Sequence, residues 1–195
     1  MLDFNYQVPT RILFGKNKIE KLGKEIRKYA RRILLVYGGG SIKRSGLYDK
    51  VVNILHEEEI EFYELPGVQP NPRISSVRSG VELCRKNNLE LVLAVGGGST
   101  IDCAKIIAAG VYYAGDPWDF FLRKAAITKA LPVGTVLTLA ATGSEMNGNA
   151  VISNEATQEK LGTGSSLLYP AFSILDPQYT FTVSPFQTAA GTADI

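Results

Sequence analysis

Two glycine triplets constrain the fold of this 195-residue chain more than any other feature. The apolar run at 33–37 leads into Gly38-Gly39-Gly40-Ser41, and the run at 89–95 leads into Gly96-Gly97-Gly98-Ser99. A pattern with helical spacing follows each triplet. Because ordering glycine costs more entropy than ordering any other residue, three in a row indicate that another group approaches the backbone closely.

The order of the remaining elements predicts an α/β fold. Strand-like runs end near residues 37, 65 and 95, and a helical pattern follows each of them. This alternation is typical of a Rossmann-like parallel sheet with helices on both faces. We also expect Asn71-Pro72 to cap the helix after the second run, and Ser99 or Thr100 to cap the helix after the third.

The two ends of the chain add further elements to this plan. We expect two short strands in the first fifteen residues and a buried strand at 132–140. Short alternating segments at 149–176 indicate antiparallel strands added to the sheet. Ser184-Pro185 begins one more helix.

Composition excludes several classes of partner. Lys plus Arg exceed Asp plus Glu by 21 − 19 = 2, and no basic, aromatic-interleaved stripe is present, which argues against nucleic-acid binding. No apolar stretch reaches the roughly 20 residues that span a bilayer, and the amino terminus does not resemble a signal peptide. Cys84 and Cys103 fall on apolar helix positions, so we expect packed free thiols and a cytoplasmic protein.

The second triplet has the properties of a phosphate cradle. Between a strand and a helix, glycine offers bare N–H groups beside the positive end of the helix dipole, and the Ser99 and Thr100 hydroxyls add donors. The alternative is a tight turn that only requires a positive φ. Neither G-x-G-x-x-G nor the P-loop spacing fits residues 96–101, so a simple Rossmann enzyme or P-loop NTPase is disfavoured.

The first triplet bears on the choice of dinucleotide. A carboxylate at this position would bind the ribose 2′-hydroxyl of NAD, but the sequence has no Asp or Glu between Val36 and Gly46. It has Ser41, Lys43 and Arg44, which could accommodate a 2′-phosphate. The hypothesis is that NADP(H) is preferred over NAD(H); the alternative is that both basic residues are solvated.

Several segments together resemble the iron-containing (group III) alcohol dehydrogenases, and in particular their butanol dehydrogenase-like branch. From about residue 10 to the last residue they occur in the order of the family: TRILFGKNKIEKLG, YGGGSIKRSG, PNPRIS, AVGGGSTIDCAK, TLAATGSEMNGNAVISN, EKLGTGS, SILDPQYTFTVSP and GTADI. Each segment is weakly specific, whereas the set is highly specific.

The resemblance implies two domains and an activity. Residues 1–183 would be a dinucleotide-binding α/β domain, and 184–195 the start of a helical metal-binding domain. The whole protein would transfer hydride between a short primary alcohol, or its aldehyde, and NAD(P). The alternatives are a nucleotide-binding module without turnover and an enzyme of the related glycerol dehydrogenase and dehydroquinate synthase branch. The amino-terminal strands could pair across a homodimer.

The resemblance also assigns cofactor-binding positions. Added to Lys43 from the argument above, they are Gly38, Gly39, Gly40, Ser41, Asn71, Gly96, Gly97, Gly98, Ser99, Asp102, Thr138, Thr142, Asn147 and Lys160. From the residues alone, Asp102 could be a carboxylate that complements the helix dipole, and Lys160 a solvated β-edge residue. Thr138 and Thr142 could be ordinary strand and turn residues. Lys105 is expected on the helix surface.

The family binds a divalent metal, iron or zinc, through one Asp and three His, and Asp194 matches the Asp. The first His of the family follows four residues later, at a position beyond Ile195. The one histidine of the chain, His56, is expected at an exposed helix end. We therefore assign no catalytic residue in this chain, expect it to be inactive alone, and expect the whole protein to have the two-domain size of the family.

Overall fold

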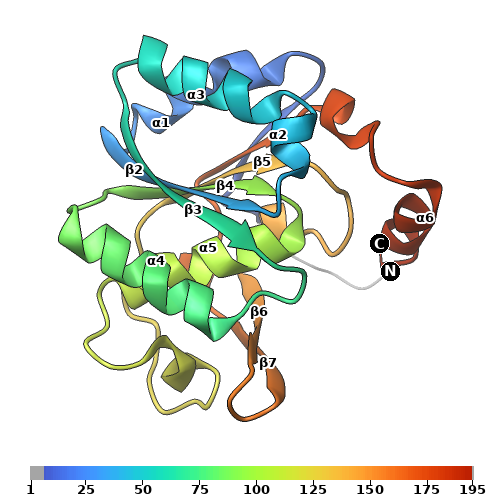
Figure 1. Cartoon of the computed structure of the whole chain (residues 1–195). Helices are drawn as coiled ribbons and strands as arrows, with labels where there is room; N and C mark the ends of the chain where they lie inside the picture. The colour runs from blue at the N-terminus through green and yellow to red at the C-terminus, as the bar shows by residue number, and fades with distance from the viewer. Residues whose placement is uncertain (1–6, 195) are drawn as a thin grey trace.

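The computed structural model, which describes residues 7–194, contains a six-stranded sheet in which every neighbouring pair is parallel (Figure 1). Across the sheet the strands are β1 (Arg11–Phe14), β8 (Phe172–Leu175), β5 (Val133–Leu137), β4 (Leu91–Gly96), β2 (Arg32–Gly38) and β3 (Glu61–Val68). A separate antiparallel hairpin is formed by β6 (Asn149–Asn154) and β7 (Glu159–Gly164).

Helices cover both faces of the sheet (Figure 1). On one face lie α1 (Leu22–Ile26), α2 (Ser41–Arg44) and α3 (Leu47–Glu57), and on the other α4 (Ile74–Lys86) and α5 (Gly98–Gly110). The last helix, α6 (Pro185–Asp194), lies beside these layers. Short 3-10 helices fill the connections: η1 (Lys18–Lys21), η2 (Pro117–Phe120), η3 (Ser144–Met146), η4 (Ser166–Leu168) and η5 (Pro177–Thr180).

The central strands are apolar because both of their faces are buried. In β2, Leu34 and Val36 belong to the hydrophobic cluster under α4 and α5, whereas Leu35 and Tyr37 belong to the cluster under α1 and α3. Successive strand residues point to opposite faces, so one continuous apolar run serves both clusters. The predicted parallel sheet with helices on both faces is confirmed.

The topology brings the two glycine triplets together. From β2 the chain crosses to β3 on one side, whereas from β4 it crosses to β5 on the other side, and β2 and β4 are direct neighbours. Tyr37 pairs with Val95, so the triplet after β2 lies next to the triplet after β4. Open α/β sheets bind their ligands at such a switch point, outside the carboxyl ends of the strands.

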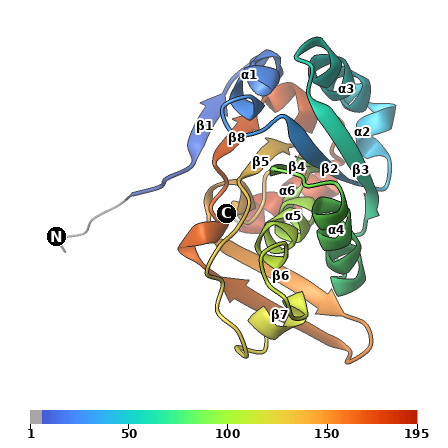
Figure 2. The ribbon, with the colours of Figure 1, turned by 90° about the vertical axis from the view of Figure 1, so that its left-hand side faces the viewer.

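The prediction for residues 149–176 is partly wrong. The antiparallel pair β6–β7 does not join the main sheet; it projects from the α5 side as a sheet of its own (Figure 2). Backbone contacts attach it to the start of α4, where the Ser153 N–H donates to the Pro72 carbonyl over 2.8 Å. The next strand, β8, does join the main sheet, but in parallel orientation. Alternation identifies strands but not the sheet to which they add.

Helix starts also differ from the prediction. The N-cap of α4 is Arg73, and Asn71 lies in a turn before it with a φ of 55°. The N-cap of α5 is Gly97, which places Ser99 and Thr100 inside its first turn. Of the two amino-terminal strands, β1 is present, and residues 1–6 lie outside the described part of the chain.

Two expectations about the chain as a whole can be compared with the structure. Cys84 and Cys103 are buried free thiols, as predicted. Among the described residues, no helix has the length and apolar character needed to cross a membrane.

Candidate cofactor site

Two cavities border the glycine turn at the start of α5. The first, the α5 cavity, has a volume of about 470 Å³. Seven of the predicted residues line it: Asn71, Gly98, Ser99, Asp102, Thr142, Asn147 and Lys160. The second, the α2 cavity, measures about 310 Å³ and contains the predicted residues Ser41, Gly97 and Thr138. Leu139 lines both cavities, and of the neighbouring glycines Gly97 lines the α2 cavity and Gly98 the α5 cavity.

The three glycines of this turn serve different purposes. None has a positive φ, so the tight-turn explanation does not account for them. A Cβ on Gly96 would lie 2.6 Å from the Thr100 hydroxyl oxygen, so this glycine is required by internal packing. On Gly98 the nearest atom would be the Thr142 hydroxyl oxygen at 3.6 Å, an ordinary contact. Gly98 thus leaves open a space that a small side chain would occupy.

The turn also presents hydrogen-bond donors. The Thr100 and Ile101 N–H groups donate to the Gly97 carbonyl, over 3.0 and 3.2 Å. The N–H groups of the first two helical residues, Gly98 and Ser99, have no intrahelical acceptor because none precedes them in the helix. Both residues line the α5 cavity. This helix end therefore has the chemistry of an anion site.

Asp102 lies one helical turn further along α5 and is held on both carboxylate oxygens. The Ser144 hydroxyl donates to Oδ1 over 2.6 Å, and the Val151 N–H donates to Oδ2 over 3.0 Å. Burial raises the pKa of Asp102, whereas these two hydrogen bonds and the charge of Lys105 oppose the rise. Asp102 is thus a positioned acceptor in the wall of the cavity.

Lys160 reaches the same cavity from the hairpin. Its ammonium group donates to the Asn71 Oδ1 over 2.6 Å, joining β7 to the turn before α4. These residues are 89 positions apart in the chain. The fold, rather than local sequence, brings this cation and amide to one site.

Asn147 turns its amide toward the protein as well as lining the cavity. Its Nδ2 donates to the Thr142 carbonyl over 3.3 Å, and its Oδ1 accepts from the Asn149 N–H over 2.9 Å. The segment from Thr142 to Asn149 is therefore fixed by its own polar groups.

The α2 cavity is reached by only some of the predicted residues of the first triplet. Ser41 lines it together with Arg44. The Lys43 ammonium lies 4.5 Å from the centroid of the Tyr48 ring and 5.4 Å from that of Tyr37, and Lys43 lines neither cavity.

The glycines of the first triplet shape the backbone. A Cβ on Gly38 would lie 3.3 Å from the Val68 carbonyl oxygen, whereas Gly39 has open space around it. Gly40 has a φ of 109°, which only glycine adopts without strain. These three residues, like Gly96, line neither cavity.

Sequence reasoning missed Lys105, which is completely buried rather than on the helix surface. The signal was present in the helix, because apolar residues occupy all of its faces between Ile101 and Gly110. Such a helix is buried all round, so a single lysine within it must be buried too. Ser144 and Tyr179 were also missed; they lie in short 3-10 helices without a periodic pattern.

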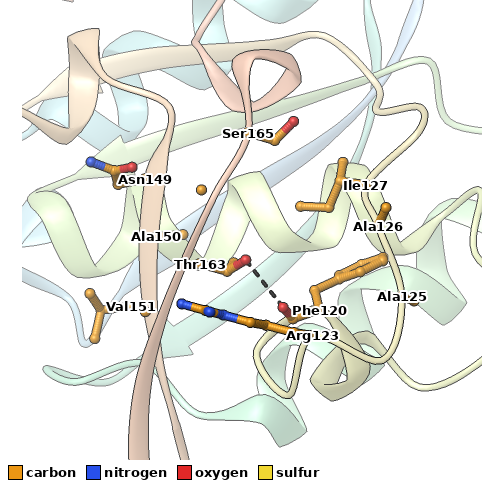
Figure 3. A pocket seen from close by; sticks show the side chains of 12 residues that line it. Phe120, Arg123, Ala125, Ala126, Ile127, Asn149, Ala150, Val151, Thr163 and Ser165 are labelled. Atoms are coloured by element: carbon orange, nitrogen blue, oxygen red, sulfur yellow. Dashed lines mark hydrogen bonds between the residues drawn. The ribbon is translucent and has the colours of Figure 1, made fainter.

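A larger pocket of about 760 Å³ shares its β6 residues Asn149, Ala150 and Val151 with the α5 cavity (Figure 3). Phe120, Arg123 and Ile127 form one wall, and the hairpin residues Val151 and Thr163 form the opposite wall. None of the predicted site residues lines this pocket. Its walls carry one charged side chain, Arg123, and few groups that could bind a polar cofactor. We therefore do not choose it as the candidate site, although it is larger.

The described residues do not form a metal site. Within residues 7–193, whose side chains the structure describes, no group of three or more His, Cys, Asp or Glu side chains is placed to hold a metal ion. Asp194 is the last residue of α6. His56 is exposed in the last turn of α3, with its ring against Phe62.

Comparison with known proteins now adds to this geometry. The sequence profile described as "Iron-containing alcohol dehydrogenase" matches residues 9–177. The chain belongs to the iron-containing alcohol dehydrogenase family.

Relatives of the chain include enzymes named for different cofactors. The chain is 62% identical to the NADH-dependent butanol dehydrogenase A of Clostridium acetobutylicum, covering 100% of this chain and 50% of that protein. It is 43% identical to the NADPH-dependent aldehyde reductase YqhD of Escherichia coli, again over 100% of this chain and 50% of the relative. The chain therefore spans about half the length of the curated relatives it matches.

A solved structure agrees with the fold described above. The crystal structure of the NADH-dependent butanol dehydrogenase A of Thermotoga maritima superposes with a TM-score of 0.96 at 51% identity. The match covers 98% of this chain and 48% of that one. The α/β architecture is thus shared with about half of that larger chain.

Proposed function

We propose that this chain is the cofactor-binding part of an NAD(P)-dependent, metal-dependent alcohol dehydrogenase or aldehyde reductase. The whole protein would transfer hydride between a short primary alcohol and the nicotinamide. The observation that carries the proposal is the glycine turn, where Gly97 lines one cavity and the adjacent Gly98 lines another. A dinucleotide has this shape, with a pyrophosphate between two nucleosides.

The polar groups of the two cavities indicate how the cofactor would be oriented. The pyrophosphate would accept hydrogen bonds from the N–H groups at the start of α5. The nicotinamide ribose would occupy the α5 cavity, where Asp102 can accept from a hydroxyl group and Lys160 can donate to one. The adenosine would occupy the α2 cavity beside Ser41, Thr138 and Arg44.

The predicted preference for NADPH now depends on Arg44. Lys43 is engaged by two tyrosine rings, whereas Arg44 lines the α2 cavity, where a 2′-phosphate would lie. The relatives described as NADH-dependent butanol dehydrogenases point to the other cofactor. The preference for NADPH remains a prediction, which the relative affinities of the chain for NADPH and NADH would test.

The metal requirement is proposed for the whole protein, because the described residues of this chain do not provide a site. One carboxylate, Asp194, is too few, since catalytic metals are held by about three protein ligands. When bound, such a metal polarises the alcohol oxygen as a Lewis acid. The residues described above would bind and orient the dinucleotide.

We propose two domains, one for the dinucleotide and one for the metal. Residues 1–183 would bind the dinucleotide, and residues 184–195 would begin the helical metal-binding domain. A homodimer remains a prediction. The free thiols of Cys84 and Cys103 support a reducing compartment, and we propose the cytoplasm.

A titration of the chain with NADH and with NADPH tests the proposal. Binding is followed by nicotinamide fluorescence, with and without added metal. We expect saturable binding that does not depend on metal, and tighter binding of NADPH if Arg44 acts as described. Absence of binding by both cofactors would defeat the proposed function. Tighter binding of NADH would defeat only the preference.

A second candidate is a nucleotide-binding module without turnover; within residues 7–193, no group of side chains is placed to hold a metal ion. Two measurements separate the candidates. The intact mass of the natural protein shows whether it has the two-domain length of its relatives. Oxidation of C2–C5 primary alcohols by that protein, with iron or zinc added, then shows whether it turns over.

A further inference from the structure

The ammonium group of Lys105 has an unusually complete set of partners for a lysine inside a protein. Its side chain is fully buried. Nζ lies 2.9 Å from the Ser144 hydroxyl oxygen and 2.8 Å from each of the Asn147 and Asn149 carbonyl oxygens. The Asn147 Oδ1 is a fourth acceptor at 3.2 Å. The three N–H donors of an ammonium are therefore all used.

The contact with Ser144 gives direction to the hydrogen bond on Asp102. Because the Ser144 oxygen accepts from Lys105, its own hydrogen can be donated elsewhere, and the Asp102 Oδ1 lies 2.6 Å away. The chain of donors thus runs from the ammonium through the hydroxyl to the carboxylate. Val151 N–H holds the other carboxylate oxygen. Asp102 meets the α5 cavity as an acceptor whose orientation is already set.

The other three acceptors fix the wall of the cavity. Asn147 and Asn149 both line the α5 cavity, and Lys105 holds them from behind by their backbone carbonyl oxygens. The Asn147 Oδ1 is shared between Lys105 and the Asn149 N–H. One buried cation therefore supports two features of the same site, the Asp102 carboxylate and the 147–149 segment.

The charges around this group favour the arrangement. Burial lowers the pKa of Lys105 to about 8, opposed by the carboxylates of Asp102, on the same helix, and Glu145, in η3. The ammonium form therefore predominates at neutral pH. Among the described groups near Asp102, Lys160 of β7 lines the same cavity, and burial raises the pKa of the adjacent Cys103 to about 12.

We propose that Lys105 is a positioning residue for the cofactor, which aims Asp102 through Ser144 and fixes the Asn147–Asn149 wall before the ribose binds. The inference rests on the proposed function. A methionine has similar length and no charge, and would fill the same space without desolvating a cation. A lysine there is thus better explained by what its charge and donors do than by packing.

The test compares Lys105→Met with Lys86→Met, which removes the same charge from an exposed position at the end of α4. The carboxyl carbon of Asp102 is followed by NMR against pH, with Asp102→Asn used for assignment. In Lys105→Met we expect the titration midpoint of Asp102 to rise by about one pH unit or more, because a nearby cation favours the carboxylate. We expect Lys86→Met to leave it unchanged.

NADH affinity is measured in parallel on the same proteins. We expect Lys105→Met to bind NADH at least tenfold more weakly at pH 7, with a greater loss at pH 6. An unchanged Asp102 midpoint, or unchanged NADH affinity, overturns the proposal. Wild-type chain that fails to bind NADH overturns the proposed function, and the inference with it; a loss confined to Lys105→Met leaves the proposed function standing.

Ser144→Ala keeps the proposal falsifiable if Lys105→Met does not fold. It removes the intermediate hydroxyl and leaves the ammonium in place. In Ser144→Ala we expect the titration midpoint of Asp102 to rise less than in Lys105→Met. We also expect weaker NADH binding, with a greater loss at pH 6 than at pH 7. No change in either quantity overturns the relay through Ser144.

Discussion

At the residue scale, a substitution of Gly98 should weaken cofactor binding without destabilising the fold. In Gly98→Ala the added methyl group meets nothing closer than 3.6 Å, so we expect the free energy of unfolding to stay within about 0.5 kcal/mol of wild type. The methyl group enters the α5 cavity beside the proposed pyrophosphate position, so NADH affinity should fall about tenfold or more. Urea unfolding and fluorescence titration measure the two effects.

Gly162→Ala is the matched control for this prediction, because its methyl group would also make only ordinary contacts, 3.8 Å from Val151, and Gly162 does not line the α5 cavity. Its NADH affinity should equal that of wild type. Full affinity in Gly98→Ala would show that the cofactor does not approach this backbone.

Lys105 carries a second prediction, which concerns stability and pH. Its pKa is about 8 in the folded chain and 10.5 when unperturbed, so the unfolded state binds more protons between these values. Stability contributed by this position therefore rises with pH across that window. The free energy of unfolding of wild type, minus that of Lys105→Met, should rise by on the order of 3 kcal/mol between pH 8 and 10.5.

Urea unfolding at several pH values measures this difference, and subtraction cancels the titration of other groups. A difference that stays flat with pH would mean that the folded lysine is not held as a desolvated cation. The sign also fits the positioning role, because a group that lowers stability at neutral pH is kept for another reason.

Sequence alone predicted several residues of the candidate site but not the groups that support them. The resemblance implied Asp102 and Lys160, which the structure brings to one cavity. Lys105 was missed because lysine is so rarely buried that exposure is the ordinary expectation. Its burial follows from four oxygen acceptors, of which three come from residues 42 or more positions away. The apolar helix around Lys105 indicated its burial, but the tertiary contacts that satisfy its ammonium group leave no local pattern.

At the element scale, Gly134 in β5 is set by the neighbouring strand β8. A Cβ on this glycine would lie 2.4 Å from the ring of Phe172, which is fully buried. Because neither the ring nor the sheet has free space, we expect Gly134→Ala to destabilise the chain by about 1–3 kcal/mol. Urea unfolding checks this, with Gly162→Ala as a strand glycine of ordinary surroundings. Equal midpoints for the two variants would contradict it.

Strands could be predicted from their sequence pattern, whereas the sheet to which a strand belongs could not. The runs ending near 37 and 95 became β2 and β4, because a strand buried on both faces is apolar throughout. The run ending near 65 became β3, an edge strand whose residues are mostly exposed or half-buried. The hairpin β6–β7 was identified as antiparallel, but its separation from the main sheet was not. That separation follows from its packing against α5 and the start of α4, which alternation does not encode.

At the scale of the whole molecule, one sheet accounts for both the stability and the site. Its two faces hold the two hydrophobic clusters, while the carboxyl ends of β2 and β4 hold the two glycine turns. The switch in strand order, which no single segment reveals, places those turns together. Nucleotide affinity and global unfolding should therefore be linked, since a ligand that binds only the folded chain stabilises it.

The two thiols report this global stability directly. Cys84 in α4 and Cys103 in α5 are 1% and 0% exposed, and burial raises the pKa of each to about 12. Because the thiolate is the reactive form, a disulfide-exchange reagent at pH 8 should label neither cysteine in the folded chain and both in concentrated urea. The labelled fraction should follow the urea transition seen by circular dichroism. Rapid labelling of either thiol without urea would contradict the packing described for α4 and α5.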